Sequence, residues 1–378
     1  MGRALIAFLQ RAYAAFRGFD DETGSVPMMD GPLRPNALLD AAPVALALND
    51  VDNVTPWQER LLCSTGGEIL HLARTAGRLV ITERRAFETP VSFIATEPSG
   101  GLAVGLDGKG VLVVDGPHAG RMIAEAGGRA LLCPTAALFL TPDDLIIANG
   151  AADHPAAEWK RNLMERGQSG SIWSVDLRRP NAEPEVLAGG LAFPNGLALA
   201  SDKKLYISEA WLHRVVTLGD QRGARPIVLL QDLPAYPGRI APAPDGGFWL
   251  SLFAPRNQLV EFVLRENAYR RRMIDNIDPA YWIAPALSSG SSFLEPIQGG
   301  ARKKLNMLKP WSPSWSYGLV ARCNSRMRPF ASLHSRADGA VHGVTSCCEA
   351  GGILYAAAKG AGRIVAVDPA WATGAPSA

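Results

Sequence analysis

The chain has few cysteines, and their arrangement excludes several classes of site. Its 378 residues include five cysteines, an odd number, and no two of them form a CxxC pair. Cys347 and Cys348 are adjacent and cannot easily bridge to each other. A disulfide framework and a zinc-thiolate site are therefore not indicated. We expect reduced, buried thiols and a cytoplasmic location.

A large charge of one sign and the common catalytic motifs are also absent. The formal net charge is +2, from 38 Lys and Arg against 36 Asp and Glu. This balance gives no electrostatic reason to expect a nucleic-acid partner. No GxSxG, HExxH or P-loop occurs, and no GxGxxG lies between a strand and a helix. The function must therefore be sought in another kind of site.

Glycine and proline are abundant instead, with 38 and 28 residues, as expected for a protein with many tight turns. Residues 193–209 read as a strand that opens at Asn195, a polar turn and a return strand. Residues 237–250 repeat this unit about 43 residues later. A repeat of this length built from short strands is typical of a β-propeller blade.

Similar strand openings recur along the chain, at Asn53, Ser92, Thr135, Asn195 and Gly238. Most are about 39 to 43 residues apart, as one blade requires. The longer gap before Asn195 predicts an insertion at about 150–168 with a short helix. A second insertion, at about 254–315, shows helical periodicity over 257–274. Such insertions commonly lie on the face that binds ligands.

The sixth repeat opens at His342 and lacks an outer strand before the C-terminus. Residues 44–48 can supply that strand and close the ring, which removes the exposed sheet edges. The predicted fold is therefore all-β, a six-bladed propeller over 42–378. Residues 1–41 are predicted to form an amphipathic helix over 2–19 and an extended linker. The helix is too short and too charged to span a bilayer, and either packs on the domain or makes peripheral membrane contact.

Four of the segments quoted above resemble one family. Residues 193–196, 205–209, 233–237 and 245–249 resemble the strictosidine synthase-like branch of the senescence marker protein/gluconolactonase superfamily. The resemblance implies a six-bladed propeller with a site in the central channel. Members include calcium- or zinc-dependent lactonases and esterases, and plant enzymes that condense an amine with an aldehyde without metal.

The resemblance also implies a metal held by a Glu, two Asn and an Asp at the starts of inner strands. Asn195 matches one Asn, and Asn53 beside Asp52 lies near the first acid. Thr135 stands where the second Asn is expected, and Gly238-Arg239 stands in place of the Asp. We therefore expect a divalent cation, Ca²⁺ ahead of Zn²⁺, on Asn195, Asn53 and Asp52. Its usual carboxylate near Gly238 is missing, and a divalent cation needs negative oxygen ligands.

Three further residues are candidates for catalysis. Glu209 beside an indole has the setting of a general acid or base, and an ion pair with Arg214 is the alternative. His342 could act as a general base or as a metal ligand, and a structural hydrogen bond to a neighbouring blade is the alternative. Arg239 either stabilises an oxyanion or pairs with Asp52 or Glu209. For substrate binding we expect Asn149, Trp211 and Thr135.

The sequence therefore favours a hydrolase of a lactone or other carboxylic ester of a small, partly apolar molecule, with or without assistance by metal. Two alternatives stay open. One is a metal-free condensing enzyme that uses one carboxylate as acid and base. The other is a propeller that binds a small ligand or a protein without turnover.

Overall fold

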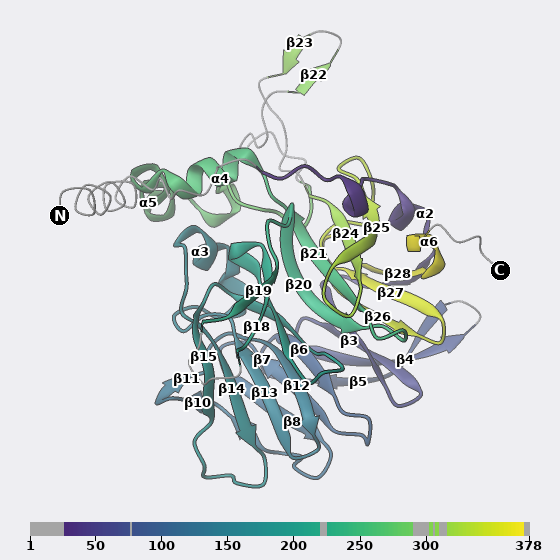
Figure 1. The fold of residues 1–378 in the computed structure, drawn as a ribbon, viewed down its shortest axis with the longest axis vertical. Coiled ribbons are helices and arrows are strands. Elements are labelled where there is room, and N and C mark those ends of the chain that lie inside the picture. Colours follow the sequence, from purple (N-terminus) through teal and green to yellow (C-terminus); the bar gives the residue numbers. More distant parts are fainter. Residues whose placement is uncertain are drawn as a thin grey trace.

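The protein was analysed as a computed structural model, which describes residues 26–75, 78–219, 225–289, 302–304, 307–309 and 316–373. The helix predicted over 2–19 lies outside these residues. Six four-stranded antiparallel sheets form the body of the molecule (Figure 1). This confirms the predicted all-β, six-bladed propeller.

The first three blades follow one another along the chain. Blade 1 consists of β2 (Val51–Trp57), β3 (Arg60–Thr65), β4 (Glu68–Thr75) and β5 (Arg78–Ala86). Blade 2 consists of β6 (Val91–Thr96), β7 (Leu102–Leu106), β8 (Gly110–Asp115) and β9 (Met122–Ile123), and the short pair β10 (Glu125–Ala126) and β11 (Arg129–Ala130) follows it. Blade 3 consists of β12 (Pro134–Thr141), β13 (Asp144–Asn149), β14 (Gly170–Asp176) and β15 (Glu185–Leu191).

The other three blades complete the ring. Blade 4 consists of β16 (Pro194–Leu199), β17 (Leu205–Glu209), β18 (Arg214–Thr217) and β19 (Ile227–Leu230), with the turn η3 (Ala210–Leu212) after β17. Blade 5 consists of β20 (Ala235–Pro242), β21 (Phe248–Pro255), β24 (Gly318–Cys323) and β25 (Pro329–Ser335). Blade 6 consists of β26 (Val344–Ala350), β27 (Ile353–Ala358), β28 (Arg363–Val367) and β1 (Val44–Ala47), with η5 (Lys359–Ala361) after β27.

The ring closes through the strand nearest the N-terminus. β1 pairs antiparallel with β28, with Leu46 opposite Ile364. The inner strands β2, β6, β12, β16, β20 and β26 each contact the next, and β26 contacts β2. Closure by residues 44–48 was predicted and is confirmed. β1 thus takes the outer position of blade 6, and the first and last described strands of the chain share one sheet.

The core lies between facing blades rather than at the axis. One apolar cluster, for example, joins Leu61, Cys63 and Leu70 of blade 1 to Tyr355 and Ile364 of blade 6. All five cysteines are free and buried, as expected. Burial raises the pKa of the Cys63 and Cys347 thiols to about 12, so they stay protonated and unreactive.

Both predicted insertions are present, and both carry helices. Between β13 and β14 lie η2 (Ala156–Glu158) and α3 (Trp159–Met164). Between β21 and β24 lie α4 (Gln258–Arg265), α5 (Asn267–Asn276), η4 (Pro279–Tyr281), β22 (Arg302–Lys304) and β23 (Met307–Lys309). The side chain of Asn257 caps α4 by accepting a hydrogen bond from the Leu259 N–H. Figure 1 shows α3, α4 and α5 gathered at one end of the propeller.

The segment before β1 is fixed on blade 5, although a plain linker was predicted there. It holds η1 (Gly31–Leu33) and α2 (Leu38–Ala41), and α6 (Ala370–Thr373) also contacts β25. Asn36 Nδ2 donates to the Ser332 carbonyl at 3.0 Å, and Ser335 Oγ donates to Asp40 at 2.7 Å. In the part of the chain that the structure describes, no helix is long and apolar enough to cross a membrane.

Candidate functional site

Every inner strand begins with a break in its pairing register. The residues that have no paired partner are Asp52-Asn53, Ser92, Thr135, Asn195, Gly238-Arg239 and Thr345. A bulge leaves its extra residue outside the ladder and redirects the side chain. These six positions therefore surround the axis at one end of the channel. Five of them coincide with the strand openings read from the sequence.

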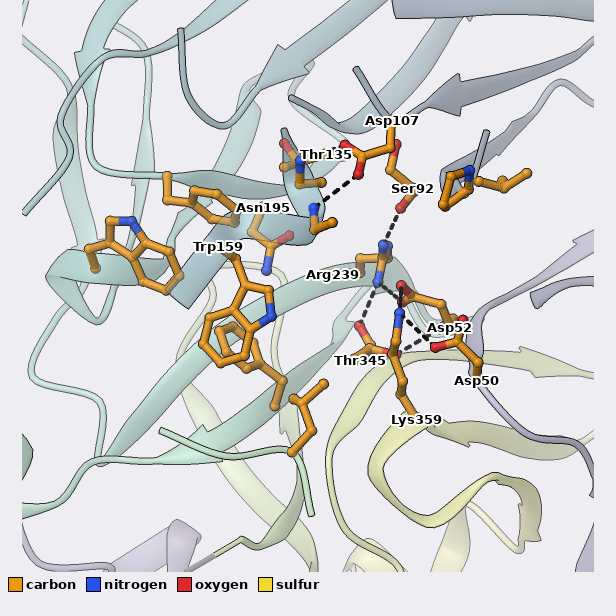
Figure 2. Close-up of a pocket in the computed structure, with 18 residues that line it drawn as sticks. Asp50, Asp52, Ser92, Asp107, Thr135, Trp159, Asn195, Arg239, Thr345 and Lys359 are labelled. Carbon is orange, nitrogen blue, oxygen red and sulfur yellow. Dashed lines mark hydrogen bonds and ion pairs between the residues drawn. The ribbon is translucent and has the colours of Figure 1, made fainter. Parts of the chain in front are cut away.

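A cavity of about 370 Å³ lies at this end of the channel (Figure 2). One part of its wall is polar and charged, lined by Asp50, Asp52, Ser92, Asp107, Thr135, Asn195, Arg239, Thr345 and Lys359. The other part is apolar, lined by Trp159, Phe193, Trp211, Phe253 and Leu287. A mostly apolar cavity with a few convergent polar groups is the usual form of a small-molecule site.

Arg239 is at the centre of the charged part. Its Nη1 donates to Asp52 Oδ1 at 2.7 Å and to the Thr345 carbonyl at 3.2 Å, and its Nη2 donates to the Ser92 carbonyl. Asp52 Oδ2 in turn accepts from Lys359 Nζ at 3.0 Å. Lys359 also lies 3.2 Å from Asp50 Oδ1. Figure 2 shows these groups joined in one network.

The network fixes the charge of its members. Burial alone would raise the pKa of Asp52, but the adjacent Arg239 and Lys359 outweigh it and lower that pKa to about 2. Asp52 likewise raises the pKa of Lys359 against the effect of its burial. At neutral pH Asp52 is therefore ionised and Lys359 protonated.

Two groups in the polar part keep hydrogen-bonding capacity. Asn195 is half-buried, and its side-chain amide forms no hydrogen bond with the residues the structure describes. A guanidinium carries five N–H donors, and Arg239 uses three of them. The Nε donor is buried without an acceptor, so one Nη2 N–H is left without an acceptor among the described residues.

Asp107 is the third distinctive polar group. It follows β7 directly, and its carboxylate accepts from Ala156 N at 2.5 Å and Ala157 N at 3.0 Å. Burial raises the pKa of this carboxyl, and the backbone hydrogen bonds only partly oppose the rise. Asp107 thus ties the blade 3 insertion to blade 2 and is also a carboxylate that takes up a proton more readily than usual.

The apolar part is a set of packed aromatic rings. Phe193 stacks on Trp211 with centroids 4.4 Å apart, and Trp159 meets Phe253 edge to face at 5.7 Å. Trp211 Nε1 donates to Asn162 Oδ1 at 2.8 Å, which holds its ring in place. The rings come from blades 4 and 5 and from the blade 3 insertion, so the apolar wall depends on that insertion.

The expected divalent cation can be tested against these contacts. Asn53 is buried, does not line the cavity, and its Nδ2 donates to Ser64 Oγ at 2.8 Å. Both oxygens of Asp52 already face cations, and the guanidinium of Arg239 lines the same cavity as Asn195. Among the described residues no group of three or more His, Cys, Asp or Glu could hold a metal ion. These residues do not fit a divalent cation at the axis.

The structure brings together Asp52, Thr135, Asn195, Trp211 and Arg239 of the residues singled out from the sequence. Thr135 Oγ1 donates to the Pro194 carbonyl at 2.5 Å. It therefore joins two blades as well as lining the cavity.

The other singled-out residues lie outside the cavity lining. Glu209 is buried, accepts from Ala192 N at 2.8 Å and pairs with Arg214 at 2.7 Å, which is the alternative weighed for it. His342 precedes β26, and its two ring nitrogens contact Ser316 Oγ and the Arg336 carbonyl, each at 2.7 Å. Asn149 spans Cys133 N and the Ala151 carbonyl. Each of these side chains is satisfied by its own surroundings.

Asp107 and Lys359 line the cavity but were not predicted from the sequence. Their position just after the second strand of a blade could have identified them. Asp107 directly follows β7, Lys359 directly follows β27, and Trp211 lies two residues after β17. The end of a second strand lies beside the start of the inner strand, because the two strands are antiparallel neighbours. Residues just after second strands therefore reach the same cavity as the inner-strand openings.

Comparisons with known proteins bear on the fold. No family model matches the chain. An alignment over 164 residues shows 27% identity to the adipocyte plasma membrane-associated protein of Bos taurus, and it covers 38% of this chain and only 39% of that protein. A gluconolactonase structure from Xanthomonas campestris superposes with a TM-score of 0.52 at 12% identity, covering 86% of this chain and 87% of the other.

A second solved structure, also assigned as a gluconolactonase, gives a TM-score of 0.50 at 10% identity and covers 86% of this chain and 91% of the other. Identities this low carry information about the fold alone. The resemblance drawn from the sequence is thus confirmed at that level, and the chain is a six-bladed propeller of the kind found in gluconolactonases.

Proposed function

We propose that the central cavity hydrolyses a lactone or other carboxylic ester of a small, partly apolar molecule, using the chain's own residues. The observation that carries this proposal is one cavity that holds a free amide, a fixed guanidinium and a carboxylate of raised pKa. These belong to Asn195, Arg239 and Asp107. They supply the donors and the base that ester hydrolysis needs.

In the proposed reaction the carbonyl oxygen of the ester accepts from Asn195 Nδ2 and from the remaining Nη2 N–H of Arg239. Asp107 takes a proton from water as the water oxygen attacks the carbonyl carbon. The tetrahedral oxyanion is stabilised by the same two donors. It collapses with cleavage of the carbon–oxygen bond, and Asp107 returns the proton to the departing alkoxide.

The aromatic wall supports this use of the cavity. Trp159 and Phe253 offer an apolar surface for the part of the substrate that does not react. The charged network holds Arg239 in one position, so little reorganisation is needed when charge develops on the substrate.

A panel of lactones and aryl esters, assayed with and without EDTA, tests the proposal. We expect turnover in EDTA, and a loss of about 10²-fold in kcat for Asn195→Ala. Asn181→Ala is the matched control, because Asn181 is exposed and lies in a turn of blade 3. Failure of every substrate in the panel would refute the proposal, and so would equal activity of the two variants.

Binding without turnover is the second candidate. It is favoured by one observation, that both oxygens of the Asp107 carboxylate already accept a hydrogen bond, from Ala156 N and Ala157 N. In that case some lactones or esters of the same panel raise the unfolding temperature of the protein, and they are recovered unhydrolysed.

A further inference from the structure

One side chain links four blades across the axis. Arg239 belongs to β20 of blade 5, and its guanidinium bonds Asp52 of blade 1, Ser92 of blade 2 and Thr345 of blade 6. The side chain of Arg239 is 18% exposed, and that of Asp52 is 15% exposed. The pair is therefore shielded enough for the charge–charge contact to be substantial.

A belt of side-chain hydrogen bonds runs around the same axis, each from one blade to a backbone carbonyl of the next. From blade 1 onward the donors are Asn53, Ser92, Thr135, Ser208, Ser251 and Thr345, and the accepting carbonyls are those of Ser92, Pro134, Pro194, Gly238, Thr345 and Asp52. The lengths run from 2.5 to 3.5 Å, with the longest between Asn53 and Ser92. Each of these six carbonyls at this end of the channel thus has a protein donor.

Carbonyl and carboxylate oxygens at a propeller axis are the groups that would coordinate a cation. Here they are satisfied by protein donors, and the fixed positive charge comes from Arg239. These residues therefore do not fit the expected metal site, because protein donors already bind the oxygens and Arg239 supplies the positive charge.

We propose that Arg239, together with the belt, takes the place of an axial cation, so that this propeller holds its blades and its cavity in register without bound metal. Arg239 acts in this role as a positioning residue for Asp52, Ser92 and Thr345. Lys359 supports it by holding the second oxygen of Asp52.

The test measures metal content and thermal unfolding of the full chain, so its result does not depend on turnover. We expect less than about 0.1 equivalent of calcium or zinc after desalting. We also expect an unfolding temperature that changes by less than about 1 °C between EDTA and millimolar CaCl₂, because a ligand stabilises only the state that binds it. Stoichiometric metal that is lost together with stability in EDTA would overturn the proposal.

Variants of Arg239 test the role of the guanidinium. Arg239→Met should lower the unfolding temperature by roughly 5 °C or more, because it leaves Asp52 paired with Lys359 alone. Arg178→Met is the matched control, since Arg178 is 60% exposed and pairs with Asp176 at the surface. Arg239→Met within about 1 °C of Arg178→Met would contradict the inference.

Arg239→Lys keeps the test decisive if the methionine variant does not fold. A lysine keeps the charge but cannot reach three blades with a planar fork of donors. We expect it to fold with an intermediate unfolding temperature and no response to calcium. Wild-type stability in Arg239→Lys would show that charge alone suffices and would overturn the proposed bridging role.

Discussion

The two parts of the cavity wall are built on different principles. The charged part joins blades 1, 2, 5 and 6 through Arg239, and both oxygens of Asp52 are paired in it. The aromatic part comes from blades 4 and 5 and from the blade 3 insertion, and offers shape with few polar atoms. In the reaction proposed above, the charged part holds the blades in register and supplies the donors to the substrate carbonyl, and the aromatic part binds the apolar portion of the substrate.

The largest expected effect is a loss of activity on substitution of Asp107. This residue lies in the charged part and binds the blade 3 insertion that carries Trp159 of the aromatic part. Asp107→Asn should lower kcat by about 10²- to 10⁴-fold, because a carboxamide cannot take a proton from water. In the wild type, activity should rise as pH increases through a pKa above the usual 3.8 of aspartate, and then stay level. A pH–rate profile checks both statements. An unchanged profile in the variant would show that Asp107 only anchors the insertion.

The next effect is on the stability of the charged part. Asp52→Asn leaves Arg239 and Lys359 without their common carboxylate, and we expect about 3 kcal/mol less free energy of unfolding. Urea unfolding followed by circular dichroism measures the change. Asp202→Asn, which removes an exposed surface partner of Lys204, is the control and should change the free energy of unfolding far less. Equal losses in the two variants would mean that the axial network contributes no more than a surface pair.

The dependence of stability on acid pH also tests the contribution of Asp52. The pKa of Asp52 is lowered from 3.8 to about 2 in the folded state, so its contribution to stability is present above pH 3.8 and is lost as pH falls through 2. The loss amounts to about 2 kcal/mol. Denaturant unfolding between pH 5 and pH 2 should therefore show a step in the wild type that Asp52→Asn lacks. The same slope in both proteins would assign the acid sensitivity to other groups.

The smallest effect is expected in the aromatic part. Trp159 is half-buried, so Trp159→Ala should raise KM for an apolar ester by about 10-fold and leave kcat nearly unchanged. Trp173→Ala, which changes a half-buried indole in the outer part of blade 3, is the control. Steady-state kinetics on one apolar and one hydrophilic ester checks the result. An equal rise for both substrates would indicate a loss of structure and not of apolar contact.

The sequence predicted the fold and most of the axial ring, because both depend on local patterns. A repeated strand–turn–strand unit gives the blade, and five of the six inner-strand openings were located from spacing alone. The sixth opening is Thr345, because Gly343 has a φ of +64° and the strand begins only at Val344. His342 therefore lies before the strand, among Ser316 and Arg336, and not in the channel.

The rest of the site depends on contacts between blades that no local pattern contains. Asp52 and Arg239 are 187 positions apart in the chain, and Asp52 and Lys359 are 307 apart. Their pairing follows from closure of the ring, which places blades 1, 5 and 6 around one axis. From the sequence, Asp52 was considered as a partner of Arg239. The second cation that pairs with Asp52, Lys359, was found only in the structure.

One measurement tests the central claim most directly: kcat/KM for one hydrolysed lactone on EDTA-treated, metal-free protein, before and after addition of CaCl₂. In our interpretation Arg239 and Asn195 donate the hydrogen bonds to the carbonyl oxygen of the lactone. We therefore predict full kcat/KM before CaCl₂ is added and no increase afterwards. Activity that is absent until calcium is added would contradict the interpretation.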